Sequence, residues 1–135
     1  MNPLIVGPVL AAAVGLLAHV VGYDRDRSFY AVVLTVVGSV YVLFNIMAGG
    51  GHDLVAEIGF FALFAALAAI GFRTSLWIVA AGLALHGVFD FYRQTFLAGR
   101  GVPEWWPAFC GSYDVVAALG LATLLIVQPR RRAPV

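Results

Sequence analysis

Hydrophobic residues in this chain gather in five long stretches separated by short polar segments. A helix that crosses a bilayer needs roughly 20 consecutive, mostly apolar residues, and each stretch has about that length. The stretches cover about residues 3–23, 29–48, 53–72, 75–97 and 107–128. The pattern predicts an all-α fold, an integral membrane bundle of about five transmembrane helices that forms one domain over residues 1–135.

Local chemistry at the helix starts fits these boundaries. Asp53 and Ser75 are candidate N-caps of the third and fourth helices, and Pro107 suits the first turn of the fifth. No basic residue precedes the first stretch, and that stretch is long enough to span a membrane. We therefore interpret it as a retained helix and not as a cleaved signal peptide.

The arginines predict an orientation in the cell's inner membrane. One side of a five-span bundle would carry Arg25, Arg27, Arg73, Arg130, Arg131 and Arg132, and the other would carry Arg93 and Arg100. Cytoplasmic segments are enriched in basic residues. The sequence thus predicts a cytoplasmic C-terminus and an N-terminus outside.

Composition supports a membrane protein and limits the kinds of partner that are expected. The chain is 62% hydrophobic and 11% charged, whereas soluble domains carry about 25% charged residues. The net charge of +1 gives no reason to expect nucleic acid as a partner. The expected partner is the lipid bilayer, with a small-molecule or lipid ligand and a second copy of the chain as further candidates. The single cysteine, Cys110, excludes a disulfide within the chain.

Polar residues within the stretches concentrate near the predicted outer ends of four helices. A charged side chain that faces lipid costs roughly 2.5–3.5 kcal/mol, so these residues are expected to face one pocket that opens to the extracytoplasmic side. On the fourth helix His86, Asp90 and Arg93 share one stripe. Trp105 and Trp106 are expected at its rim, in the interfacial aromatic belt. The candidate cluster consists of Asn45, His52, Glu57, His86, Asp90, Arg93, Trp105, Trp106, Tyr113 and Asp114.

Three chemistries are compatible with this cluster. His86, Asp90, Glu57 and Asp114 supply imidazole and carboxylates, which suit a divalent metal such as zinc, manganese or iron. Glu57 and Asp114 could instead act as general acid and base, since crowded buried carboxylates titrate apart. A structural network is the third alternative, in which Asp90 pairs with Arg93 and His86 bonds a neighbouring helix. Cys110 has no basic neighbour in sequence, so a catalytic thiolate is not expected.

The segment from His86 to Asp114, HGVFDFYRQTFLAGRGVPEWWPAFCGSYD, resembles small, uncharacterised bacterial multi-pass membrane proteins. Their shared pattern is HGxxD, a short loop, GVPxWWPxFC and then YD or FD. The resemblance implies one functional unit made of His86, Asp90, Trp105, Trp106, Pro107, Cys110, Tyr113 and Asp114, and it supplies no activity.

One departure from this pattern bears on the metal hypothesis. Similar sequences carry histidine shortly after HGxxD, where this chain has Tyr92 and Arg93. Arginine is not a metal ligand and adds positive charge, so this departure counts against a metal. Three hypotheses stay open: a membrane protein that binds a small ligand or ion, a membrane enzyme that acts on a lipid or isoprenoid, and a structural or oligomerising subunit.

Overall fold

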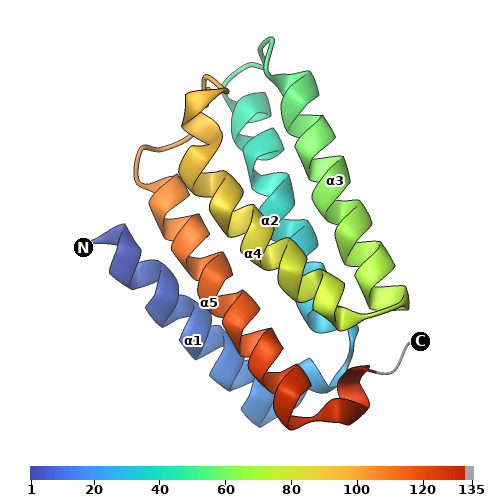
Figure 1. Ribbon diagram of the computed structural model, residues 1–135. Coiled ribbons are helices and arrows are strands. Elements are labelled where there is room, and N and C mark those ends of the chain that lie inside the picture. Colours follow the sequence, from blue (N-terminus) through green and yellow to red (C-terminus); the bar gives the residue numbers. More distant parts are fainter. Residues whose placement is uncertain (133–135) are drawn as a thin grey trace.

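The computed structural model describes residues 1–132, which fold into a bundle of five α-helices (Figure 1). The helices are α1 (Pro3–Val21), α2 (Ser28–Met47), α3 (Leu54–Arg73), α4 (Leu76–Tyr92) and α5 (Trp106–Val127), with short 3₁₀ turns at Tyr23–Arg25, Arg93–Thr95 and Pro129–Arg132. No strand occurs within the described residues. The predicted all-α bundle is confirmed.

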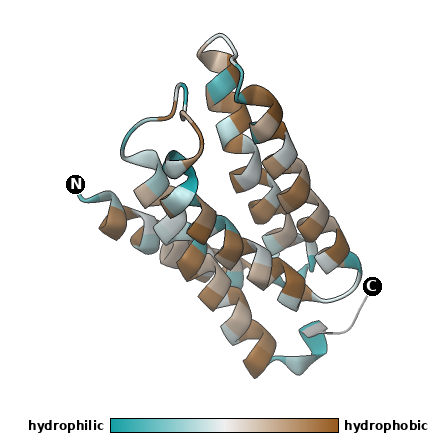
Figure 2. Ribbon diagram, turned by 45° about the horizontal axis from the view of Figure 1, so that its top comes forward, coloured by the Kyte–Doolittle hydropathy of each residue, from teal (hydrophilic) through white to brown (hydrophobic). Residues whose placement is uncertain are grey.

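Four of the five helices are long and apolar enough to cross a membrane. These are α1, α2, α3 and α5, which have 19 to 22 residues each. Figure 2 shows hydrophobic residues along the helices and hydrophilic ones in several connections and near the chain ends. The chain therefore has the character of a membrane protein.

The fourth helix is shorter than predicted, with 17 residues, and its expected end at residue 97 was wrong. The backbone tightens after Tyr92, where the carbonyl of Arg93 accepts hydrogen bonds from the N–H groups of Phe96 (3.1 Å) and Leu97 (2.9 Å). The Arg93 side chain is completely buried. The chain leaves the helix at the residue whose guanidinium group turns into the bundle.

The helices pack in the order α3, then α2 and α4 together, then α5, then α1. In this order α3 contacts α2 and α4, α4 contacts α5, and α1 rests chiefly on α5 (Figure 1). We call the end that holds the N-terminus and the α2–α3 and α4–α5 connections the N-terminal end of the bundle. An apolar core that includes Leu34, Phe64 and Leu121 fills the middle and the opposite, C-terminal end.

Polar groups tie the C-terminal end together. Arg27 donates hydrogen bonds to the carbonyl oxygens of Phe72 (3.0 Å) and Arg131 (2.9 Å). Arg131 in turn donates to the Asp24 carbonyl, and Nδ1 of His19 lies 2.8 Å from Oδ2 of Asp24. These contacts join the α1–α2 connection to the last turn of α3 and to the C-terminal arginines.

The predicted helix caps had mixed outcomes. Ser75 accepts a hydrogen bond from the N–H of Trp77 (3.4 Å), and Pro107 lies in the first turn of α5, as expected. Asp53 precedes α3 but makes no side-chain cap, so that prediction was wrong. Its carboxylate instead accepts from the N–H of Ala98 (2.9 Å) and thereby fastens α3 to the α4–α5 connection.

Two glycines bring the backbones of α4 and α5 into direct contact. A Cβ atom on Gly87 would lie 2.9 Å from the carbonyl oxygen of Gly111, and one on Gly111 would lie 3.0 Å from that of Gly87. Small residues allow membrane helices to approach this closely. The crossing places the residues that precede these glycines, His86 and Cys110, on facing helices next to the contact.

We expect Gly87→Ala to destabilise the bundle by about 1–3 kcal/mol, the usual cost of overpacking a tight contact. The measurement is thermal or denaturant unfolding of the purified protein in detergent. Gly59→Ala is the matched control, because Gly59 is an exposed helical glycine with no atom within 4 Å of an added Cβ. Equal stability of Gly87→Ala and Gly59→Ala would contradict a tight α4–α5 crossing.

Candidate metal centre

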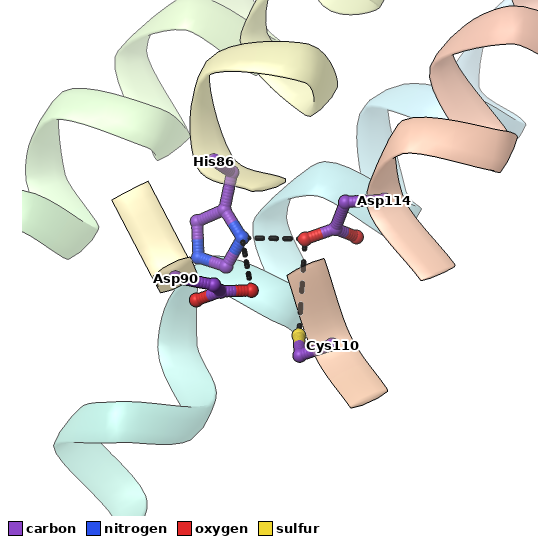
Figure 3. Close-up of side chains that lie close together, drawn as sticks. All are labelled: His86, Asp90, Cys110 and Asp114. Carbon is purple, nitrogen blue, oxygen red and sulfur yellow. Dashed lines mark hydrogen bonds and ion pairs between the residues drawn. The ribbon is translucent and has the colours of Figure 1, made fainter. Parts of the chain in front are cut away.

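The crossing of α4 and α5 assembles a group of four side chains, His86, Asp90, Cys110 and Asp114, which we call the quartet (Figure 3). Each helix contributes two residues four positions apart, so both side chains of each pair lie on one helical face. One possible ligand atom from each residue lies within 4.8 Å of the other three. Four donors of metal-binding type therefore converge on one point.

The contacts within the quartet centre on the imidazole of His86. Its Nδ1 atom lies 2.6 Å from Oδ2 of Asp114 and 3.6 Å from Oδ2 of Asp90. The Cys110 thiol lies 3.8 Å from the same Asp114 oxygen. Because α4 and α5 run antiparallel, His86 faces Asp114 across the crossing (Figure 3).

The quartet is shielded from solvent. His86, Asp90 and Asp114 are 0% exposed, and Cys110 is 2% exposed. Aromatic rings enclose the imidazole, with the Phe64 ring edge-on at 4.6 Å between centroids and the Phe89 ring at 5.9 Å. Electrostatic interactions are strong in such a water-poor environment, so the two carboxylates require a positive partner.

Tyr41 on α2 connects the quartet to a second polar group. Its hydroxyl donates a 2.6 Å hydrogen bond to Oδ1 of Asp90, and its ring lies 3.8 Å from the guanidinium carbon of Arg93. Arg93 also forms a buried ion pair with Glu57 on α3. Tyr41 therefore separates the quartet from this ion pair while contacting both.

Many polar atoms in and near the quartet and the Arg93–Glu57 ion pair have no hydrogen-bond partner among residues 1–132. A buried polar group without a partner costs about 1–3 kcal/mol, so these atoms mark the part of the bundle in which hydrogen bonding is least complete. The atoms are Oδ1 and Nδ2 of Asn45, Oε2 of Glu57, Nε2 of His86, Oδ2 of Asp90, Nε and Nη1 of Arg93, and Oδ1 of Asp114.

The residues of the predicted cluster lie at several separate places in the structure. Asp90, His86 and Asp114 come together, whereas Glu57 pairs with Arg93. Asn45 and His52 line a different cavity of about 400 Å³ at the N-terminal end, together with Gly51, Asp53, Ala98 and Arg100.

The aromatic residues of the predicted cluster lie on the α5 side. Trp106 and Tyr113 line an apolar groove, and Trp105 is 53% exposed beside Trp106. The structural network predicted from the sequence is present only in part. His86 bonds Asp114 on the neighbouring helix, as expected, whereas Asp90 bonds Tyr41 where a pair with Arg93 was expected.

Cys110 is the quartet member that the candidate cluster left out, although the unit implied by the resemblance over residues 86–114 includes it. A signal for it exists in the sequence, since HGVFD (86–90) and CGSYD (110–114) share the pattern of a metal-binding side chain, glycine, two residues and aspartate. The glycine of each segment lies at the helix crossing. Reading the two segments as one pattern identifies all four residues.

Comparisons with protein-family models, with curated proteins and with solved structures find no match for this chain. The resemblance noted for residues 86–114 stays a prediction.

We expect Arg93→Met to destabilise the protein by about 3–5 kcal/mol, because it leaves the buried Glu57 carboxylate without its partner. The double variant Glu57→Leu/Arg93→Met removes both charges and should recover most of this loss. The measurement is a double-mutant cycle of unfolding free energies in detergent. Glu104→Gln, at an exposed position of the α4–α5 connection, is the control and should change stability by less than about 0.5 kcal/mol. Additive single effects would contradict the ion pair.

Proposed function

We propose that this chain is a multi-pass protein of the bacterial inner membrane, with its N-terminus outside, that binds one divalent transition-metal ion at His86, Asp90, Cys110 and Asp114. The observation that carries the proposal is the convergence of four buried ligand atoms from two helices within 4.8 Å. Zinc fits this ligand set best, because nitrogen, sulfur and carboxylate oxygen are its usual protein ligands and four is its usual coordination number.

Two of the distances between ligand atoms fit a tetrahedral site, and the others, which range up to 4.8 Å, would adjust on binding. Zinc–ligand bonds of about 2.0–2.3 Å place neighbouring ligand atoms roughly 3.3–3.8 Å apart. The Nδ1 atom of His86 and Oδ2 of Asp90 are 3.6 Å apart, and Sγ of Cys110 is 3.8 Å from Oδ2 of Asp114. The pair of His86 and Asp114, at 2.6 Å, would open by roughly 0.7 Å to admit the ion.

Charge balance supports the same assignment. The quartet buries two carboxylates against one imidazole, so even an imidazolium leaves one negative charge uncompensated. A bound divalent cation would also displace the proton of the Cys110 thiol, so its two positive charges would offset two of the three negative charges carried by the two carboxylates and the thiolate. Arg93 does not oppose the cation as the sequence suggested, because Glu57 pairs with its charge.

The groups around the quartet have two features that are typical of metal sites. Ligand carboxylates in metalloproteins are themselves held by hydrogen bonds, and the Tyr41 hydroxyl holds the second oxygen of Asp90. Buried sites also need a rigid frame, and the glycine contact between α4 and α5 provides one.

A structural network is the competing function. The 2.6 Å hydrogen bonds of His86 with Asp114 and of Tyr41 with Asp90 favour it, because they satisfy part of the layer without an ion. Metal content distinguishes the two functions.

We expect the wild-type protein to retain about one zinc ion per chain after loading and dialysis, measured by elemental analysis. Asp90→Asn and Asp114→Asn should lower the affinity by more than the roughly 10–100-fold that loss of a ligand's hydrogen-bond partner costs. Asp53→Asn is the matched control and should retain the ion, since Asp53 lies outside the quartet.

Two results would contradict a metal site. One is the absence of stoichiometric metal after loading with zinc, manganese or iron(II). The other is equal metal content in wild type, Asp90→Asn and Asp114→Asn. Either result would leave the structural network as the function of the quartet.

A further inference from the structure

Two connections at the N-terminal end of the bundle line a polar cavity of about 400 Å³. One side belongs to the α2–α3 connection and the other to the α4–α5 connection, and both lie at the same end of the bundle (Figure 1). Two hydrogen bonds join them, from the N–H of Ala98 to Asp53 (2.9 Å) and from Nε of Arg100 to the Ala48 carbonyl oxygen (3.2 Å). Sites for small ligands have volumes of about 300–1,000 Å³, so the cavity has room for a small polar group.

Arg100 is fixed in place at this cavity while most of its guanidinium group stays free. Its Nε atom bonds Ala48, and its side chain runs past Gly51, where an added Cβ atom would lie 3.3 Å from Cδ of Arg100. The two terminal nitrogens make no hydrogen bond or ion pair within residues 1–132. Arg100 is exposed and lines the cavity, and guanidinium groups bind phosphate or carboxylate through two parallel N–H donors. Arg100 therefore suits the anionic part of a ligand.

Asp53 supplies a charge of opposite sign to the same cavity. Its Oδ2 atom accepts the hydrogen bond from Ala98, and its Oδ1 atom lies 3.1 Å from Nε2 of His52. An ionised carboxylate has about four acceptor positions, so these two contacts leave positions for further donors. No ion pair joins Asp53 to Arg100 within the described residues, although both line the cavity. The cavity thus presents one positive and one negative group that do not pair with each other.

The amide of Asn45 is a further polar group at this cavity. Asn45 lies in the last turn of α2, is 1% exposed and lines the cavity. Neither its Oδ1 nor its Nδ2 atom has a hydrogen-bond partner among residues 1–132. Buried polar groups are costly without a partner, so a ligand that offers both a donor and an acceptor would relieve this cost.

The cavity lies at the level expected for lipid headgroups. The helices α2 and α3 are candidate membrane spans of 20 residues each, and 20 residues of helix extend about 30 Å, the hydrocarbon thickness of a bilayer. The connection between them is therefore expected at the membrane surface. Trp105 is 53% exposed near the same end, and tryptophan is enriched at membrane–water interfaces. Phosphate groups of lipids are the anions at this level.

We propose that this cavity binds a zwitterionic group that joins a phosphate to a primary ammonium, the headgroup chemistry of phosphatidylethanolamine. Arg100 binds the phosphate, and the carboxylate of Asp53 accepts hydrogen bonds from the ammonium. The cavity shares no residue with the quartet, so this second site does not depend on the metal. The same chemistry occurs in soluble phosphoethanolamine, and the test below distinguishes the two sources.

The charges at the cavity predict a preference among lipids. A primary ammonium has three N–H donors, whereas the trimethylammonium of phosphatidylcholine has no N–H to offer Asp53. Phosphatidylglycerol carries the phosphate and no positive charge, so it would leave Asp53 without a cationic partner. Phosphatidylethanolamine is therefore expected to bind more tightly than either.

The test measures binding of these three lipids, with identical acyl chains, to the full-length protein in detergent by native mass spectrometry. We expect one phosphatidylethanolamine per chain, bound about 10-fold or more tightly than the other two lipids, which is the effect of one hydrogen bond to a charged group. Titration calorimetry with soluble phosphoethanolamine forms the second arm. Binding of the soluble probe would show that the headgroup suffices, and binding of the lipid alone would identify the lipid as the source.

Substitutions assign the two charges. Arg100→Gln should lower the affinity for phosphatidylethanolamine about 10-fold or more. Arg73→Gln is the matched control, because it removes the same charge at the far end of α3, and it should bind as the wild type does. Both arginines are exposed, so both variants should fold. Asp53→Asn keeps an acceptor for the N–H of Ala98 and removes the charge, so it should abolish the preference for phosphatidylethanolamine over phosphatidylcholine.

Several results would overturn the proposal. One is equal affinity for phosphatidylethanolamine and phosphatidylcholine, and another is an unchanged affinity for phosphatidylethanolamine in Arg100→Gln. Tighter binding of phosphatidylglycerol would identify a site for a simple anion and would also overturn it. So would a failure of both the lipid and the soluble phosphoethanolamine to bind.

Zinc analysis of the same samples separates this proposal from the metal site. Asp53→Asn should lose the lipid preference and retain its zinc, whereas Asp90→Asn should lose its zinc and retain the lipid preference. A lipid preference without zinc in the wild type would reject the metal site and support the headgroup site. Zinc without a lipid preference would reject the headgroup site and support the metal site.

Discussion

The contact between Gly87 on α4 and Gly111 on α5 is the constraint on which the rest of the site depends. A Cβ atom at either position would come within 3.0 Å of the facing carbonyl oxygen, so a larger residue there would push the helices apart. This separation would move His86 and Asp90 on α4 away from Cys110 and Asp114 on α5. The close crossing thus explains how residues 20 or more positions apart in the chain, on two different helices, form one buried group.

The bundle then has to accommodate charge in its interior. It does so with two adjacent units, the quartet and the ion pair of Arg93 with Glu57, and Tyr41 contacts both. The charges of the ion pair balance without a ligand, whereas the quartet holds two carboxylates for one imidazole. This difference in charge supports the proposed cation at the quartet and a structural role for Arg93 and Glu57.

Much of the fold could be predicted from the sequence, because apolar stretches of membrane length separated by short connections leave few alternatives to a helical bundle. The burial of the charged residues followed from the cost of exposing them to lipid. Which of the charged residues lie together could not be predicted. Whether Glu57 or Cys110 joins His86 depends on the rotation of each helix about its axis and on the glycine crossing, and neither follows from the hydrophobic pattern. The end of α4 was missed because the Arg93 side chain turns inward, which hydropathy does not encode.

The central claim, that the quartet holds a metal through two helices, is tested most directly by X-ray absorption spectroscopy at the zinc edge of the loaded protein. The account predicts one sulfur ligand at about 2.3 Å and three nitrogen or oxygen ligands at about 2.0–2.2 Å, with the sulfur signal lost in Cys110→Ser. A spectrum with only nitrogen and oxygen ligands in the wild type, or one unchanged in Cys110→Ser, would contradict it.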